Sequence, residues 1–135
     1  MTTAYVFGPI TGHGERFLPV YKRATQVCER YYDKVIGSWP DFWEPEADRR
    51  AYFERIRRTI VNADLFVGEL TLPSHGVGME LQMASDRNIP LIGLAEAGAK
   101  ISDLVLGLQN LRRVIHYGGM DDLERQLNEE LKRRL

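Results

Sequence analysis

The sequence has only one cysteine, Cys28, so no disulfide can form within the chain. No apolar run approaches the ~18 residues that span a membrane, and the N-terminus lacks the layout of a signal peptide. Basic and acidic residues are nearly balanced, 18 against 19, so there is no excess positive charge to attract nucleic acid. These absences favour a cytoplasmic protein with neither a membrane nor a nucleic-acid partner.

Known metal and cofactor motifs are missing as well. The histidines His13, His75 and His116 are scattered along the chain and form no cluster with Cys28 at metal-ligand spacing. The segment "GPITGHG" (8–14) spaces its glycines wrongly for a dinucleotide fingerprint and lacks the Lys-Ser/Thr pair of a P-loop. We therefore expect neither a metal ion nor a cofactor.

The sequence does contain short apolar runs that alternate with segments of helical periodicity. Its 135 residues suit a single domain, 1–135. Strands that alternate with helices favour an α/β fold with three layers: a mostly parallel five-stranded sheet with helices on both faces, as in Rossmann-like and flavodoxin-like proteins. The predicted strands are 4–8, 34–39, 65–70, 89–94 and 113–117, and the predicted helices are 17–32, 52–61 after Asp48 as a possible N-cap, about 78–87, 100–108 and 121–135.

Two loops follow predicted strands at the edge of the sheet where ligands bind in folds of this class. Loop 8–14 follows the first strand, and loop 71–78 follows the strand "LFVGEL". The glycines of the first loop would let a ligand approach the backbone closely. The alternative is a flexible turn, which the spacing by itself favours.

The segment "PSHGVGMEL" (73–81) carries a stronger chemical signal. The N–H groups at a helix start bind anions, and the Ser74 hydroxyl can donate one more hydrogen bond, so a phosphate would fit. Glu80, in the first turn of the predicted helix, would be stabilised as an anion by ~0.3–1 kcal/mol, as a nucleophile requires. The other interpretation is that Gly76 and Gly78 shape a turn and Glu80 complements the dipole, and without further information we favour it.

Aromatic and basic residues offer weaker signals between 39 and 58. Trp39, Phe42 and Trp43 lie close together in a predicted loop, where they could stack on a nucleobase or plug the loop onto the core. The run "RRAYFERIRR" (49–58) is expected to form a solvated basic helix face.

Together these segments resemble the nucleoside 2-deoxyribosyltransferase superfamily and, within it, the 2'-deoxynucleoside 5'-phosphate N-hydrolases. The likeness covers most of the chain outside residues 33–50 and the closing helix, and it is carried by "YVFGPITG", "NADLFVGELTLPSHGVGMELQMA", "IPLIGL" and "ISDLVLG". It implies hydrolysis of the N-glycosidic bond of a (2'-deoxy)nucleoside 5'-monophosphate. A covalent glycosyl-enzyme would form and then react with water, as in retaining glycosidases.

The resemblance also implies roles for individual residues. Glu80 matches the nucleophile, and Ser74 and Gly76 match residues that hold the 5'-phosphate. Ser102 matches a phosphate contact that one subunit of a homodimer supplies to its neighbour. The remaining substrate-binding positions that we infer are Tyr5, Gly8, Ile10, Thr11, Gly12, Trp39 and Gly78.

Two positions depart from the family. Thr11 stands where the family usually has an arginine, so a lower affinity for a monophosphate is expected. Ile56 stands where the second helix usually carries an acid, and isoleucine cannot handle protons. The candidates to replace that acid are Glu54, Asp48 and Glu69, of which we choose Glu54 as general acid–base. This choice needs a distorted helix, because two residues turn a regular helix by about 200°.

Two other functions stay open at this point. Base exchange between deoxynucleosides is disfavoured, because "PSHGVG" indicates phosphate recognition. A non-catalytic nucleotide-binding or sensing module would fit the missing acid at Ile56. Release of free base separates catalysis from binding, and an added acceptor base separates hydrolysis from transfer.

Overall fold

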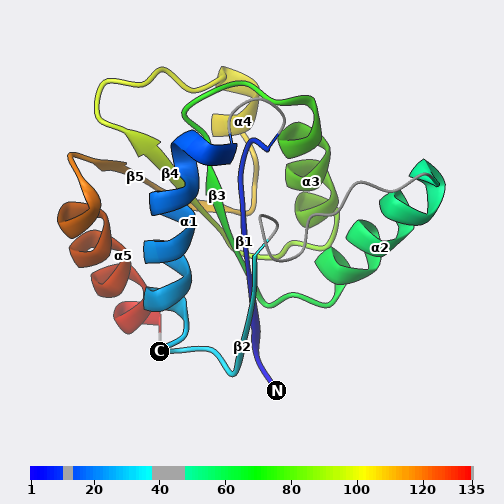
Figure 1. Ribbon diagram of the computed structural model, residues 1–135, viewed down its shortest axis with the longest axis horizontal. Helices are drawn as coiled ribbons and strands as arrows, with labels where there is room; N and C mark the ends of the chain where they lie inside the picture. Colours follow the sequence, from blue (N-terminus) through cyan, green and yellow to red (C-terminus); the bar gives the residue numbers. More distant parts are fainter. Residues whose placement is uncertain (11–13, 38–47, 135) are drawn as a thin grey trace.

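The computed structural model describes residues 1–10, 14–37 and 48–134, and Figure 1 shows how their helices and strands are arranged. Strands and helices alternate along the chain, as the sequence pattern predicts. In chain order the elements are β1 (Thr3–Phe7), α1 (Gly14–Cys28), β2 (Lys34–Gly37), α2 (Arg49–Val61), β3 (Leu65–Glu69), α3 (His75–Asp86), β4 (Leu91–Glu96), α4 (Asp103–Leu106), β5 (Leu111–Tyr117) and α5 (Met120–Arg134).

The strands form one sheet in the order β2-β1-β3-β4-β5, and every neighbouring pair is parallel. Helices α1 and α5 cover one face of this sheet, while α2 and α3 cover the other (Figure 1). The predicted three-layer α/β fold with five strands and helices on both faces is therefore confirmed.

Strand β1 shows how the sequence fills both faces. Ala4 and Val6 belong to the apolar cluster that includes α1 and α5, whereas Tyr5 and Phe7 belong to the cluster that includes α2 and α3. Successive side chains of a strand point to opposite faces, so a continuous apolar run is what a strand covered on both sides requires. The same alternation aims Tyr5 at the α2 and α3 side.

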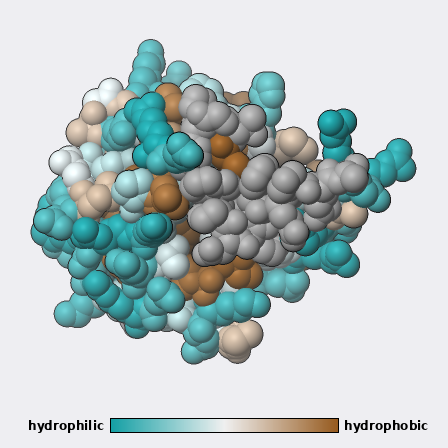
Figure 2. Space-filling model, in the orientation of Figure 1, coloured by the Kyte–Doolittle hydropathy of each residue, from teal (hydrophilic) through white to brown (hydrophobic). Residues whose placement is uncertain are grey.

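The closing helix α5 is amphipathic. Leu123, Leu127 and Leu131 are buried at four-residue steps, and Figure 2 shows hydrophilic side chains, in teal, over the side of the molecule where α5 lies. Within the described ranges, no helix combines the length and the apolar character needed to cross a membrane.

Helices α1 and α3 both begin earlier than their glycine-containing sequences suggest. Helix α1 starts at Gly14 instead of residue 17, and α3 starts at His75 instead of residue 78. In α3 the reason is the side chain of Ser74, which accepts a hydrogen bond from the N–H of Val77 and so caps the helix. This cap places Gly76 inside the helix, where the glycine pattern had indicated a turn.

Strands β1 and β3 are direct neighbours, with Phe7 opposite Gly68, so the segments that follow them meet at the carboxyl edge of the sheet. Gly8 marks this meeting point. A Cβ atom on Gly8 would lie 2.9 Å from the Cβ of Glu69 and would also strike the hydroxyl of Tyr21. A side chain at position 8 would therefore push the two segments apart.

Candidate active site

Glu80 and Tyr5 meet between α3 and β1. The Tyr5 hydroxyl donates a hydrogen bond to Oε2 of Glu80 over 2.9 Å. The Tyr5 ring is fully buried, and the rings of Phe7 and Phe66 pack against it with centroids 5.7 and 5.2 Å away. This packing fixes the position of the hydroxyl, which in turn orients the partly buried carboxyl group of Glu80.

Burial raises the pKa of Glu80 to about 7, although the hydrogen bond from Tyr5 acts in the opposite direction. The sequence led us to expect a dipole-stabilised anion in the first turn of a helix, and this expectation is wrong. Because α3 begins at His75, Glu80 lies in the second turn, beyond the strongest effect of the helix terminus. A carboxyl group with this pKa changes its protonation state near neutral pH, as functional groups often do.

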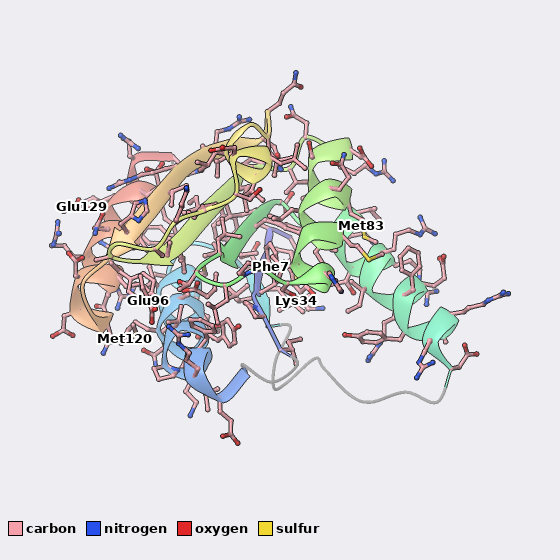
Figure 3. All side chains as sticks on the ribbon, turned by 90° about the horizontal axis from the view of Figure 1, so that it is seen from above. Phe7, Lys34, Met83, Glu96, Met120 and Glu129 are labelled. Carbon is pink, nitrogen blue, oxygen red and sulfur yellow. The ribbon has the colours of Figure 1, made fainter. Side chains whose placement is uncertain are left out.

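The side of α3 that carries Glu80 is turned towards α2. Glu80 and Met83 are three residues apart and therefore lie on the same side of the helix. Figure 3 shows Met83 where α3 and α2 approach each other, and its side chain packs against the apolar cluster that contains Tyr5. The contact between Tyr5 and Glu80 therefore lies on the side of the sheet that α2 covers.

The N-terminus of α3 lies about one and a half turns before Glu80. Oγ of Ser74 accepts the N–H of Val77 over 3.3 Å, and a hydroxyl that accepts one hydrogen bond keeps its own proton to donate. At Gly76 and Gly78, an added Cβ would meet no described atom within 4 Å. Ser74 therefore serves as a helix cap, and the first turn of α3 presents its backbone to an open surface.

Ser102 lies near Ser74 in the same chain. Both line a cavity of about 170 Å³ together with Lys100 and apolar side chains of α3 and α4. Ser102 is also the N-cap of α4, because its Oγ accepts the N–H of Leu104 over 3.2 Å. The family resemblance implies that Ser102 reaches the site of a partner subunit. Within one chain it lines the same cavity as Ser74, and the homodimer stays a prediction that sedimentation can test.

The first loop is described only up to Ile10, which is partly buried. The carbonyl of Pro9 accepts a hydrogen bond from the Tyr21 hydroxyl over 2.7 Å, so the start of the loop is tied to α1. The predicted ligand residues Thr11, Gly12 and Trp39 lie outside the described residues.

Glu54 does not join the Glu80 site. It is exposed, and its Oε2 accepts a hydrogen bond from Arg57 over 2.7 Å, an interaction that lowers the pKa of Glu54. Ile56, two positions away, is buried in the apolar cluster beside α3, and α2 is continuous from Arg49 to Val61. A regular helix thus turns Glu54 away, which corrects the prediction that this residue handles protons beside Glu80.

The other two acids considered for that role are occupied elsewhere. Asp48 caps α2, where its Oδ1 accepts the N–H groups of Arg50 and Ala51, as the sequence predicts for an N-cap. Glu69 is buried at the end of β3. Its two carboxyl oxygens accept the N–H of Thr71 and the hydroxyl of Tyr117, each over 2.5 Å.

Glu69 holds the turn that leads from β3 towards Ser74. Burial raises its pKa, whereas the hydrogen bonds from Thr71 and Tyr117 lower it. Thr71 also accepts the N–H of Glu96 through its Oγ1, over 3.0 Å, which connects the turn to β4. Glu69 is therefore a structural residue of the loop in front of α3.

We expect Glu69→Ala to lower the free energy of unfolding by about 2–4 kcal/mol, because it leaves the buried hydroxyl of Tyr117 and the partly buried N–H of Thr71 without their acceptor. Urea denaturation at neutral pH measures this loss. Glu96→Ala is the matched control, since Glu96 pairs with Arg16 on the surface over 2.6 Å with both side chains more than 40% exposed. Figure 3 shows Glu96 near α1, at the side of the molecule away from Met83. Equal losses in the two variants would contradict the role given to Glu69.

The structure adds Tyr52 and Arg55, both from the run 49–58 that the sequence analysis assigned to a solvated basic helix face. Tyr52 is partly buried and packs against the apolar cluster that contains Tyr5. The guanidinium carbon of Arg55 lies 5.6 Å from the centre of the Tyr52 ring, and Nε and Nη2 of Arg55 are buried. The neighbouring cations Arg57 and Arg58 are exposed, and the packing of the helix is what separates Arg55 from them.

In the described part of the chain, no group of three or more histidine, cysteine, aspartate or glutamate side chains is arranged to hold a metal ion. The candidate site consists instead of one carboxyl group of shifted pKa, a phenol hydrogen-bonded to it, a capped helix N-terminus and an inward-facing arginine. These groups suit chemistry in which a carboxylate attacks a substrate that carries an anion.

No protein-family model matches the chain, but two named proteins are similar to it in sequence. A protein of Syntrophotalea carbinolica is 37% identical over 75 residues, which span 54% of this chain and 52% of that protein. A protein of Thermofilum pendens is 29% identical over 134 residues, 94% of this chain and 93% of that protein. Both names assign these relatives to the 2'-deoxynucleoside 5'-phosphate N-hydrolases. The chain therefore matches about half the length of the first relative and nearly all of the second.

Solved structures share the fold. A CMP N-glycosidase of Clostridium botulinum has a TM-score of 0.67 at 16% identity, over 93% of this chain and 98% of that chain. A 2-deoxyribosyltransferase of Leishmania mexicana has a TM-score of 0.61 at 16% identity, over the whole of both chains. The names of the sequence relatives describe N-hydrolases, and the solved structures share the fold of this chain. The chain is thus similar in sequence to the 2'-deoxynucleoside 5'-phosphate N-hydrolases.

Proposed function

We propose that this protein hydrolyses the N-glycosidic bond of a 2'-deoxynucleoside 5'-monophosphate and that Glu80 is the nucleophile. The observation that carries the proposal is the contact between Tyr5 and Glu80, one and a half turns from the capped start of α3. The sequence likeness to named N-hydrolases supports the same reaction.

In the first step, a carboxylate oxygen of Glu80 forms a bond to the anomeric carbon while the bond from that carbon to the base nitrogen breaks. The bonding electrons leave with the base, and a neutral glycosyl ester forms. Tyr5 donates to Oε2, which orients the carboxylate and presents Oε1 as the attacking atom. Burial favours the neutral form of Glu80, so converting the buried anion into an ester relieves its poor solvation.

In the second step, water attacks the anomeric carbon and Glu80 leaves as a carboxylate. The proton of the water passes to the released base or to solvent, so the products are free base and sugar phosphate. Two attacks on opposite sides of the anomeric carbon retain its configuration.

The 5'-phosphate would bind at the start of α3. The first N–H groups of a helix have no partner within the helix, and the helix dipole favours an anion there. Ser74 can donate its hydroxyl proton to the same anion while it caps the helix. The open surface over Gly76 and Gly78 supports a close approach of phosphate to the backbone.

We expect Ser74→Asp to weaken binding of a nucleoside monophosphate by about tenfold or more, because a negative charge would face the phosphate. Aspartate is as good an N-cap as serine, so the stability of α3 should be preserved. Calorimetric titration with a monophosphate and with its nucleoside provides the comparison, since the nucleoside should bind the two proteins alike. If the wild-type protein binds both ligands with equal affinity, the phosphate site at α3 is refuted.

Base release is the direct test of the reaction. The protein is incubated with a panel of nucleoside monophosphates, and free base is measured by chromatography. An added acceptor base should leave the yield of sugar phosphate unchanged if water is the acceptor, whereas a new nucleoside monophosphate would indicate base exchange. Nucleotide binding without any released base would support a sensing module instead.

A further inference from the structure

The proposed reaction leaves one chemical problem, because Ile56 cannot stabilise the departing base and Glu54 points away from the site. When the glycosidic bond breaks, negative charge develops on the base. Some group must offset this charge if the base is a poor leaving group.

We propose that the guanidinium group of Arg55 donates a hydrogen bond to the leaving base, at the acceptor atom next to the glycosidic nitrogen. In a pyrimidine this atom is the carbonyl oxygen O2, and in a purine it is the ring nitrogen N3. This inference rests on the proposed function and adds a leaving-group residue to it.

The placement of Arg55 is the first argument. It belongs to the inner side of α2, where Tyr52 is partly buried and Ile56 and Ile60 are buried. Its Nε and Nη2 atoms are buried, and its guanidinium carbon lies 5.6 Å from the centre of the Tyr52 ring. A flat cation beside an aromatic ring is held in a defined orientation.

The position of Arg55 relative to Tyr5 and Glu80 is the second argument. Burial raises the pKa of Tyr5, the charge of Glu80 adds to the effect, and the charge of Arg55 opposes it. Arg55 therefore acts electrostatically on the phenol that is hydrogen-bonded to Glu80. Met83, three residues after Glu80, lies where α3 and α2 approach each other (Figure 3), so α2 is the helix beside the side of α3 that bears Glu80.

The chemistry of arginine is the third argument. Arginine keeps its proton at any working pH, so it does not act as a general acid. It stabilises the electron pair that moves onto the base nitrogen as Glu80 bonds to the anomeric carbon. The base then leaves as a hydrogen-bonded anion and takes its proton from water. A guanidinium group has five donors, which lets Arg55 hold contacts within the protein and with a base at once.

The test compares leaving groups. The substrates are the 2'-deoxynucleoside 5'-monophosphates of 5-fluorouracil, uracil and thymine, in which the acidity of the leaving nitrogen falls in this order. We expect Arg55→Ala to lower kcat by about 10²-fold with thymine, as for loss of one oriented donor, and by clearly less with 5-fluorouracil. Added guanidinium ion should restore part of the lost rate, and Arg55→Lys should retain part of it.

Arg57→Ala is the matched control, because Arg57 lies on the same helix but is exposed and pairs with Glu54. This variant should match the wild-type rate with all three substrates. An equal loss for the three leaving groups in Arg55→Ala, with no rescue by guanidinium, would overturn the inference even if kcat fell.

Should Arg55→Ala fail to fold, the slope of rate against leaving-group acidity in Arg55→Lys decides the question: an unchanged slope refutes the role. Failure of the proposed function itself would look different, since the wild-type protein would then release no base from any substrate.

Discussion

Glu80→Gln is expected to lower the rate of base release by about 10⁴-fold or more, because an amide cannot form the glycosyl ester. Glutamine has nearly the same shape as glutamate and can still accept the hydrogen bond that Tyr5 donates to this position. The variant should therefore keep its fold and its affinity for a nucleoside monophosphate. The measurements are a chromatographic assay of free base and a calorimetric titration of the nucleotide.

Tyr5→Phe provides the matched comparison for this variant. It removes the hydroxyl that orients Glu80 but leaves the nucleophile in place, so its loss of rate should be much smaller than that of Glu80→Gln. A folded Glu80→Gln protein that releases base at the wild-type rate would exclude Glu80 as the nucleophile.

The second large expected effect is the dependence of kcat/KM for base release on pH. The nucleophile must be ionised, and burial raises the pKa of Glu80 to about 7. We expect kcat/KM to fall about tenfold for each pH unit below that pKa and to reach a plateau above it. A rate that is independent of pH between 5 and 8 would show that ionisation of Glu80 does not control catalysis.

The same pKa predicts how stability changes with pH. The unfolded chain has the ordinary glutamate pKa of about 4.3, whereas folded Glu80 holds its proton up to about pH 7. Between these values the folded state binds more protons than the unfolded state, so stability is lost as the pH rises and stays lower above pH 7. Glu80→Gln has no carboxyl group to ionise at this position, so it does not lose this stability as the pH rises. It should exceed the wild-type protein in stability at pH 8, by about 3 kcal/mol, and lose the advantage near pH 4.

The fold could be predicted because its signals are local. The apolar runs of β1 and β3 and the four-residue spacing of buried leucines in α5 follow directly from strand and helix periodicity. The starts of the helices were predicted less accurately than the strands, because Gly76 and Gly78 suggest a turn unless the cap by Ser74 is recognised. Capping is a side-chain contact, which composition alone does not reveal.

Part of the candidate site could be identified from the sequence. The segment that holds Ser74 and Glu80 is contiguous, so a motif could point to it. The pKa of Glu80 could not be predicted, since it depends on burial and on Tyr5, which lies 75 residues away in the sequence. Arg55 was missed because its neighbours on α2 are exposed cations, and only the packing of the helix shows that this one faces inward.

The geometric objection to Glu54 proved to be the correct physical argument. Residues two apart on a regular helix point in nearly opposite directions, and α2 is continuous from Arg49 to Val61. With Ile56 buried, Glu54 is directed to solvent, where it pairs with Arg57. Sequence spacing on a helix was thus a better guide here than the choice of the nearest acid.

Trapping the glycosyl-enzyme tests the central claim most directly. The protein is mixed with a 2'-fluorinated nucleoside 5'-monophosphate, whose electron-withdrawing fluorine slows breakdown of the ester, and the quenched protein is digested and analysed by mass spectrometry. The account predicts one added sugar phosphate on the peptide that contains Glu80, and none in Glu80→Gln. Release of base with no adduct, or an adduct on another residue, would contradict it.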